Sequence, residues 1–254
     1  MARALLIDVD GTLTVGGRPV DGAPQALASL RRAGIPFLLV TNTTRFPLRQ
    51  LVADLSRQGF SVHPDEVFPA LRASARFLRR KGWNPVWPLV VPAAMEDLTG
   101  LKIAEEGAEA VLVGDLGEEW NFDLLNRALQ ALHNGAELVA IHKNRTWRTG
   151  EGLMLDTGPF VAALEYAADV KAHVVGKPSD LFYREAADIL SASFEEIVSV
   201  GDDVESDVAS VIALKGQGVL VRTGKYVPGQ EDRAKVPPTD VLDSIASLPK
   251  WLGL

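Results

Sequence analysis

Two carboxylates separated by one residue are the first feature of this sequence that could do chemistry. Asp8 and Asp10 come directly after the apolar run 4–7, and Gly11 follows them. Such a pair can hold a divalent cation, or divide nucleophilic attack and proton transfer between its members. Solvated turns rich in Asp and Gly have the same composition, so the pair alone does not decide between the two interpretations.

A second acidic group follows the apolar run 197–200. Asp202, Asp203, Glu205 and Asp207 lie within six positions, where their charges repel one another. Helix capping and the helix dipole explain one or two of these acids. A hard cation that prefers oxygen ligands explains both acidic groups, so the sequence predicts Mg²⁺ as cofactor.

Two polar segments could bind an anion. Thr41 and Asn42 follow the apolar run 37–40, and Lys177 lies in a Gly-Lys-Pro sequence after another apolar run. A Thr-Asn pair is an ordinary turn, and most lysines are solvated surface residues. Gly and Pro restrict the backbone around Lys177, which makes it a better candidate for a fixed positive charge.

The elements that would position these residues follow an alternating pattern. The runs 4–7 and 37–40 are predicted strands, and the segment 24–32 between them has helical periodicity. A strand–helix–strand unit with short connections places its strands parallel and adjacent. Asp8 and Thr41 should therefore emerge at the same carboxyl edge, where open α/β sheets bind ligands.

The same alternation continues along the chain and predicts an α/β fold. A Gly-Gly pair at 16–17 predicts a small hairpin. We expect further strands at 86–91, 110–113, 138–142, 197–200 and 218–221. We expect further helices at 70–81, 122–133, 158–168, 181–190, 204–214 and, at the end of the chain, 241–251.

Composition and charge exclude several classes of function. The net charge of −7 argues against a nucleic-acid-binding surface. The absence of Cys excludes thiol catalysis and cysteine-ligated metals, and the four His are widely spaced. No stretch approaches the ~18 apolar residues of a membrane span, and the run 4–7 is too short for a signal peptide. We therefore expect a cytoplasmic enzyme.

The four polar segments resemble, in order and in type, the motifs of the haloacid dehalogenase superfamily. These are Asp8-Val9-Asp10-Gly11-Thr12, Thr41-Asn42, Gly176-Lys177-Pro178 and Gly201-Asp202-Asp203. The long segment between the second and third motifs resembles the cap of the class IIA branch, as in 4-nitrophenyl phosphatases. Stretches at 158–165 and 221–226 resemble the subgroup that contains phospholysine phosphohistidine inorganic pyrophosphate phosphatase. The resemblance implies a Rossmann-like parallel-sheet core (1–75 and 176–254) with a large α/β cap inserted at 76–175.

The resemblance also implies a mechanism. The chain would be a Mg²⁺-dependent phosphatase in which Asp8 attacks phosphorus and forms a phospho-aspartate, while Asp10 is the general acid and base. Mg²⁺ would be held by the carboxylate of Asp8, the backbone carbonyl of Asp10 and the side chain of Asp202. Asp203 and Asp207 would orient metal-bound waters or the lysine of the third motif.

Thr41, Asn42 and Lys177 would hold the phosphoryl group of a small phosphorylated metabolite. The acid at Asp10 disfavours carbon–halogen cleavage, because dehalogenases of the superfamily lack it. A binding or regulatory protein that has lost turnover is the alternative reading of the same motifs. A nucleotide-binding Rossmann protein is excluded by the lack of a Gly-x-Gly-x-x-Gly after the first strand.

Substrate choice would fall to the cap. The segment 142–148 follows a predicted strand and concentrates positive and aromatic residues in an acidic protein: Lys143, Asn144, Arg145, Trp147 and Arg148. One interpretation is a loop that meets the organic part of a phosphate ester. A solvated basic loop or a dimer contact is an equally good one. Proteins of this branch often dimerise through the cap, so we expect a homodimer.

Overall fold

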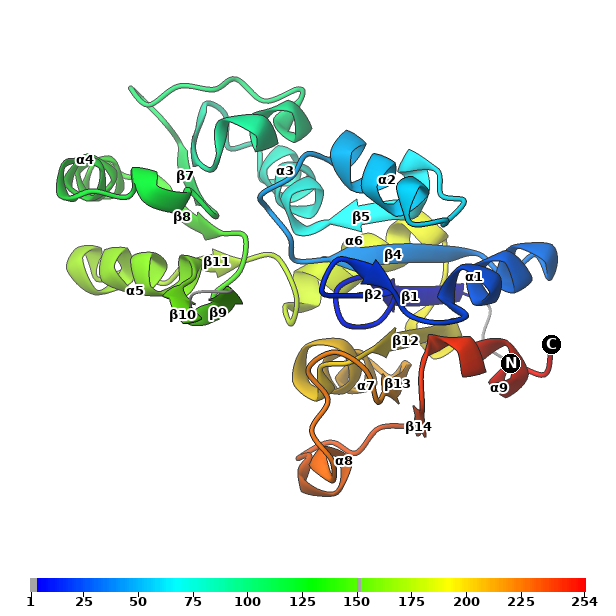
Figure 1. The fold of residues 1–254 in the computed structure, drawn as a ribbon. Helices are drawn as coiled ribbons and strands as arrows, with labels where there is room; N and C mark the ends of the chain where they lie inside the picture. Colours follow the sequence, from blue (N-terminus) through cyan, green and yellow to red (C-terminus); the bar gives the residue numbers. More distant parts are fainter. Residues whose placement is uncertain (1–3, 150–151) are drawn as a thin grey trace. The chain divides into compact units, whose positions relative to one another are not determined.

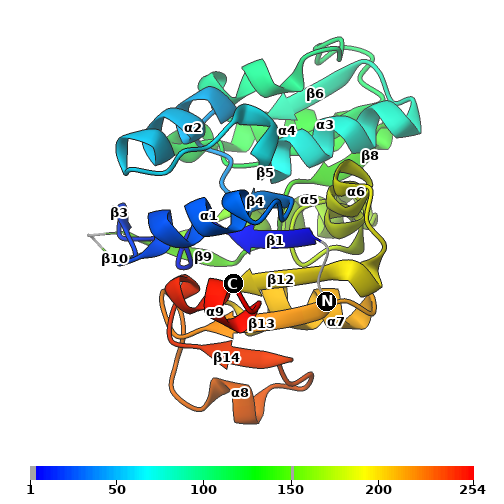
Figure 2. The same ribbon diagram turned by 90° about the vertical axis from the view of Figure 1, so that its right-hand side faces the viewer.

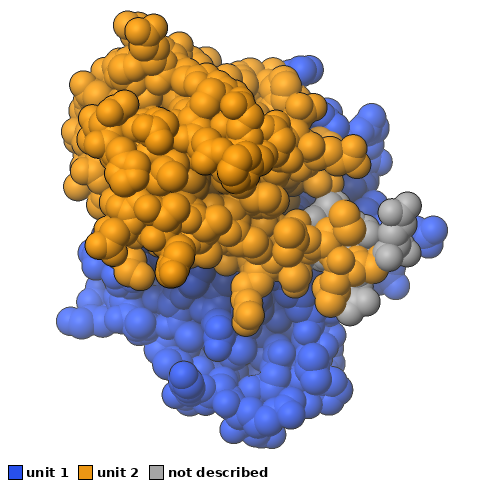
Figure 3. All heavy atoms as spheres, turned by 90° about the vertical axis from the view of Figure 1, so that its left-hand side faces the viewer, with its two compact units in different colours: residues 1–41, 48–68, 177–254 blue, residues 42–47, 69–176 orange. Residues whose placement is uncertain are grey.

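The computed structural model describes residues 4–149 and 152–254, and of residues 147–149 it describes the backbone (Figure 1). The chain forms two compact units. The first comprises residues 1–41, 48–68 and 177–254, and the second residues 42–47 and 69–176 (blue and orange in Figure 3). Within the second unit, helix α3 (Ala70–Lys81) packs against the 3₁₀ segment Pro92–Leu98.

The first unit contains a six-stranded sheet in the order β14-β13-β12-β1-β4-β5, which Figure 2 shows strand by strand. Its strands are β1 (Ala4–Asp8), β4 (Phe37–Thr41), β5 (Val67–Pro69), β12 (Ile197–Gly201), β13 (Gln217–Val221) and β14 (Asp240–Leu242). Strand β1 pairs in parallel with both β12 and β4, with Ile7 opposite Val200 and Asp8 opposite Val40. The three strands therefore end together, and the polar residues that follow them lie at one edge.

Both faces of this sheet are buried. Leu5, Ile7 and Leu39 belong to a core cluster on one face, which includes apolar residues of α1, α2 and α9. Leu6 and Leu38 point to the opposite face, where α6 and α7 contact the sheet, and are also buried. The helices are α1 (Ala23–Arg32), α2 (Leu48–Arg57), α6 (Asp180–Leu190), α7 (Ser210–Ala213), α8 (Gln230–Arg233) and α9 (Leu248–Trp251). The predicted α/β core with a parallel sheet is confirmed.

The second unit has its own parallel sheet and core. The sheet runs β11-β8-β7-β6, with β6 (Val86–Leu89), β7 (Ala110–Val113), β8 (Glu137–Ala140) and β11 (His173–Val174). Helices α4 (Phe122–His133) and α5 (Thr157–Ala168) lie side by side (Figure 1). At their amino ends Trp120 stacks on Phe160 with ring centroids 4.2 Å apart. This unit is the α/β insertion that the sequence predicted.

The end of the chain differs from the prediction. Instead of one helix over 241–251, the structure has strand β14, a 3₁₀ turn (Ile245–Ser247) and the short helix α9. Strand β14 extends the sheet beside β13. Pro249 lies in the first turn of α9, because proline fits the first turn of a helix and not its interior. Pairing at the sheet edge prevails over helical periodicity here.

Two further local predictions have different outcomes. The Gly-Gly hairpin is confirmed: β2 (Thr14–Val15) and β3 (Arg18–Pro19) pair around Gly16 and Gly17, both with positive φ. The segment 142–148, read as a loop, instead runs into strand β9 (Thr146–Thr149), which forms a hairpin with β10 (Gly152–Leu155). Within the described ranges, none of the helices is long and apolar enough to cross a membrane.

The core of the first unit allows a stability test. Leu39 is fully buried in strand β4, so Leu39→Ala removes its apolar contacts and leaves a cavity. We expect the free energy of unfolding in urea to fall by about 3 kcal/mol. Leu254→Ala, the same change at an exposed leucine of this unit, should alter it by less than about 0.5 kcal/mol. Equal effects of the two substitutions would contradict this account of the core.

Candidate active site

A buried lysine and two carboxylates form the centre of the polar edge of the first sheet. Asp8 is the last residue of β1, and Lys177 precedes the amino end of α6. The Nζ of Lys177 lies 2.5 Å from Oδ1 of Asp8 and 2.8 Å from Oδ1 of Asp207. All three side chains are almost completely buried, so water screens these charges little.

A third carboxylate joins this group. Asp8, Asp202 and Asp207 each offer an oxygen within 4.8 Å of the other two, and together with Lys177 we call them the acidic cluster. The ammonium of Lys177 balances only part of their charge. Oδ2 of Asp8 is buried without a hydrogen-bond partner among the described residues. A buried carboxylate oxygen needs such a partner, and a divalent cation ligated by oxygens fits this donor set.

The backbone packs closely around Asp202. Gly11 and Gly224 both have positive φ, and a Cβ on either would lie 2.0 Å from Oδ2 of Asp202. The N–H of Lys225 donates to the same oxygen at 2.6 Å. The hydroxyl of Thr223 donates to the carbonyl of Gly11 at 2.5 Å. The segment 223–225 therefore ties the turn after β1 to the fourth motif.

The sequence interpretation did not assign this segment to the site. The sequence of residues 221–226 indicates only a resemblance to the family. The available signal was a Thr-Gly-Lys sequence directly after an apolar strand, the same position that carries the acids after β1 and β12. A contact between segments more than two hundred residues apart cannot be recognised from such a local pattern.

Two acids near the fourth motif, Asp203 and Asp207, lie in different environments. The side chain of Asp203 accepts from the N–H groups of Glu205 and Ser206, each at 3.1 Å, and therefore caps the following turn. Its other oxygen lies 3.3 Å from Nζ of Lys225. Asp207 instead joins the acidic cluster, although the sequence interpretation gave it only an orienting part. Oδ2 of Asp207 also accepts from the N–H of Asp203 at 3.2 Å.

Three of the predicted site residues are not part of the acidic cluster: Asp10, Thr41 and Asn42. Thr41, buried at the end of β4, donates from Oγ1 to Oδ2 of Asp10 at 3.3 Å. Asp10 is solvent-exposed, and its carboxylate is outside the acidic cluster in the described part of the chain. Asn42 belongs to the second unit and is not among the residues that the first unit brings together.

Burial and charge shift the pKa values within the cluster. Burial raises the pKa of Asp8 well above its usual range, the negative charge of Asp207 adds to this, and Lys177 opposes it. Burial works against the cation at Lys177, but Asp207 and Asp8 outweigh it and raise its pKa. Burial raises the pKa of Asp202 to about 6, despite the N–H donated by Lys225. The directions are those of a site with an excess of negative charge.

The basic segment of the second unit is only partly described. Lys143 forms an ion pair with Glu165 at 2.6 Å, so its charge is partly neutralised within the unit. Asn144 and Arg145 are exposed. The side chains of Trp147 and Arg148 lie outside the described part. The proposed contact of this segment with substrate stays a prediction.

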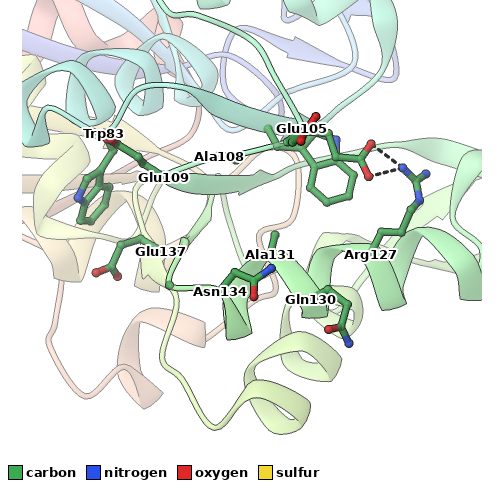
Figure 4. Close-up of a pocket in the computed structure, with 13 residues that line it drawn as sticks. Trp83, Glu105, Ala108, Glu109, Arg127, Gln130, Ala131, Asn134 and Glu137 are labelled. Carbon is green, nitrogen blue, oxygen red and sulfur yellow. Dashed lines mark hydrogen bonds and ion pairs between the residues drawn. The ribbon is translucent and has the colours of Figure 1, made fainter.

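The second unit also contains a cavity of about 640 Å³ at the amino ends of its strands (Figure 4). The segment after β8 lies at the opposite end of the same sheet. Three of the acids that line the cavity have partners. Glu105 pairs with Arg127 at 2.5 Å, Glu137 lies 3.3 Å from His173, and Glu109 accepts from the N–H of Asn84. Unlike the acidic cluster, the carboxylates that line this cavity are exposed, so water screens their charges.

The acidic cluster should lower the stability of the metal-free protein at neutral pH. The pKa of Asp202 is raised to about 6, above that of a carboxyl in the unfolded chain. Between about pH 4 and 6 the folded state therefore holds a proton that the unfolded chain has released. Stability from this group is therefore lost as pH rises from about 4 towards 6. We expect Asp202→Asn to raise the melting temperature in EDTA at pH 7.5, and to raise it much less at pH 4.5.

The neighbouring acid provides a matched control with the opposite sign. Burial works to raise the pKa of Asp203, but the N–H of Ser206 and the charge of Lys225 lower it overall. Its stabilising effect is present above the unfolded pKa and is lost as pH falls through the folded one. Asp203→Asn should therefore lower the melting temperature at pH 7.5. Shifts of the same sign in both variants would disprove this division.

Comparison with known proteins agrees with this geometry. Residues 5–104 match a model of haloacid dehalogenase-like hydrolases, and residues 174–248 a second model described as HAD-hydrolase-like. The chain is 39% identical over 236 residues to the human haloacid dehalogenase-like hydrolase domain-containing protein 2, covering 93% of this chain and 90% of that protein. It is 33% identical over 251 residues to the Xenopus laevis phospholysine phosphohistidine inorganic pyrophosphate phosphatase, covering 96% and 92%.

Solved structures show the same relationship. A p-nitrophenyl phosphatase from Archaeoglobus fulgidus superposes with a TM-score of 0.91 at 29% identity, covering 98% of this chain and 99% of that one. NagD from Escherichia coli K-12 superposes with a TM-score of 0.89 at 26% identity, covering 96% and 97%. These matches extend over both units, and they confirm the branch expected from the motifs. The chain belongs to the family of haloacid dehalogenase-like hydrolases.

Proposed function

We propose that this protein is a Mg²⁺-dependent phosphatase that hydrolyses small-molecule phosphate monoesters through a phospho-aspartate on Asp8. The observation that carries the proposal is the environment of Asp8. One carboxylate oxygen is held by Lys177, and the other is buried beside two further carboxylates without a partner among the described residues. The named activities of the relatives support the same class of reaction.

The cation would be held by Asp8 and Asp202, with the backbone carbonyl of Asp10 as the further ligand implied by the resemblance. When bound, it supplies positive charge against the phosphate oxygens and the attacking carboxylate. Asp207 lies within reach of the same position and binds Lys177. The excess negative charge of the acidic cluster favours such a cation and disfavours a bare anion.

Asp8 is suited to be the nucleophile because a carboxylate needs no base to attack phosphorus. The ammonium of Lys177 holds Oδ1 and so fixes the orientation of the carboxylate. Since Lys177 is itself held by Asp207, its position does not depend on substrate. This preorganised charge also stabilises the phosphoryl oxygens during transfer.

Asp10 is suited to proton transfer because it stays in contact with solvent. The hydroxyl of Thr41 holds one oxygen of its carboxylate at 3.3 Å. In the first step Asp10 would protonate the leaving-group oxygen, and in the second it would take a proton from the water that hydrolyses the phospho-aspartate. Asn42 and the segment 142–148 would contribute to binding of the phosphate ester. The homodimer stays a prediction.

The catalytic claim is tested with 4-nitrophenyl phosphate. We expect Mg²⁺-dependent release of phosphate by the wild type, loss of activity in EDTA, and at least about a thousandfold lower kcat for Asp8→Asn, which keeps the shape but not the nucleophile. Asp123→Asn, the same change on the surface of α4, should leave kcat unchanged. If the wild type released no more phosphate than Asp8→Asn, a binding or regulatory role would replace the proposal.

The role of Lys177 is tested separately. Lys177→Met removes the ammonium and leaves Asp8 and Asp207 unpaired, so we expect kcat/KM for the same substrate to fall by about a hundredfold or more. The acidic limb of the pH–rate profile should move to higher pH, because a cation no longer favours ionised Asp8. Lys250→Met, at an exposed lysine of α9, is the control. An unchanged pH profile in Lys177→Met would contradict the proposed role.

A further inference from the structure

A buried tyrosine that the proposed mechanism does not use lies beside the acidic cluster. Tyr183 belongs to α6 and is fully buried, and its hydroxyl donates a hydrogen bond to the backbone carbonyl of Ser206. Ser206 directly precedes Asp207 and lies in the turn that follows Asp202. The tyrosine therefore contacts the backbone of the segment that carries the clustered acids.

This segment has an unusual backbone. Residues Val204–Ala209 form a π-helical turn, which continues into the α-helix α7. Turns of this type are rare, and they interrupt the regular spacing of helical hydrogen bonds. Two of its carbonyls accept hydrogen bonds from side chains: that of Ser206 from Tyr183, and that of Glu205 from Oγ of Ser210 at 2.9 Å. The fully buried hydroxyl of Tyr183 needs an acceptor, and the hydrogen bond that it donates to Ser206 helps to hold this turn.

Helix α6 and the residues just before it contact two successive residues of the turn, Ser206 and Asp207. Lys177, just before the amino end of α6, binds the side chain of Asp207, while Tyr183, further along, binds the carbonyl of Ser206. The ring of Tyr183 is fixed by its burial and by an edge-on contact with Phe182, which in turn packs on Phe68. The hydroxyl has a defined direction, and burial raises its pKa, so it stays a donor.

We propose that Tyr183 is a positioning residue, whose hydroxyl holds the turn Val204–Ala209 in the register that keeps Asp207 on Lys177 and keeps Asp202 at the cation site. Tyr183 touches neither the substrate nor the cation in this account and acts through the backbone of Ser206. The inference rests on the proposed metal-dependent function. It adds a determinant of cation affinity that lies outside the four motifs.

Tyr183→Phe is the test, because it removes the hydroxyl and keeps the ring. Binding of Mn²⁺ to the substrate-free protein is measured by electron paramagnetic resonance, and the Mg²⁺ concentration for half-maximal hydrolysis of 4-nitrophenyl phosphate is measured separately. We expect about a tenfold rise in the Kd for Mn²⁺ and a similar rise in the Mg²⁺ half-saturation. The kcat at saturating Mg²⁺ should fall by a smaller factor, because the ligands and the nucleophile are intact.

Tyr226→Phe is the matched control. Its hydroxyl donates a hydrogen bond to the carboxylate of Glu231 at 3.0 Å, and this pair is outside the acidic cluster. The control should leave the Kd for Mn²⁺ unchanged. The melting temperature of both variants in EDTA reports any general loss of stability.

Each outcome decides the inference. An unchanged Kd for Mn²⁺ in Tyr183→Phe would overturn it, even with a lower melting temperature, because the tyrosine would then only stabilise the fold. Failure of Tyr183→Phe to fold would overturn it for the same reason. If the wild type itself neither bound Mn²⁺ nor hydrolysed the ester, the proposed function would fail first, so the two failures are distinguishable.

Discussion

The rest of the site depends on the ammonium of Lys177, buried between Asp8 and Asp207. Two buried carboxylates at this distance would repel each other strongly, and the lysine makes their proximity tolerable. It does not neutralise the third acid, Asp202, so the cluster keeps an excess of negative charge. The ammonium of Lys177 thus affects three properties together: the ionisation of Asp8, the position of Asp207 and the negative charge that remains on the cluster.

The topology of the sheet explains why distant residues can meet there. Strand β1 lies between β4 and β12, and its register places the ends of all three strands side by side. Each strand end then contributes one polar segment. Gly11, after β1, and Gly224, after β13, are required sterically, since a side chain at either would occupy the position of the Asp202 carboxylate. The fold brings the acids together, and the glycines leave the room in which they can meet.

Most of this arrangement could be predicted from the sequence. Asp8, Thr41 and Asp202 each end a short apolar run, so a parallel sheet places them at one edge by a local rule. The segment 223–225 and the contact of Tyr183 with Ser206 could not be predicted, because both depend on distant backbone positions. The terminal helix was predicted wrongly, because edge pairing of β14 is a tertiary effect that helical periodicity does not report.

The adjacent acids Asp202 and Asp203 show why motif position alone does not assign a role. Both follow the same strand, yet the pKa of Asp202 is raised and that of Asp203 is lowered. The difference comes from backbone N–H groups: Asp203 receives two from its own turn, whereas Asp202 receives one, from Lys225, and lies among like charges. An acid whose charge is already stabilised by the fold has little to gain from a cation. Of these two acids, Asp202 is therefore the better ligand for the proposed cation, and the turn that Asp203 caps and Tyr183 contacts follows it directly.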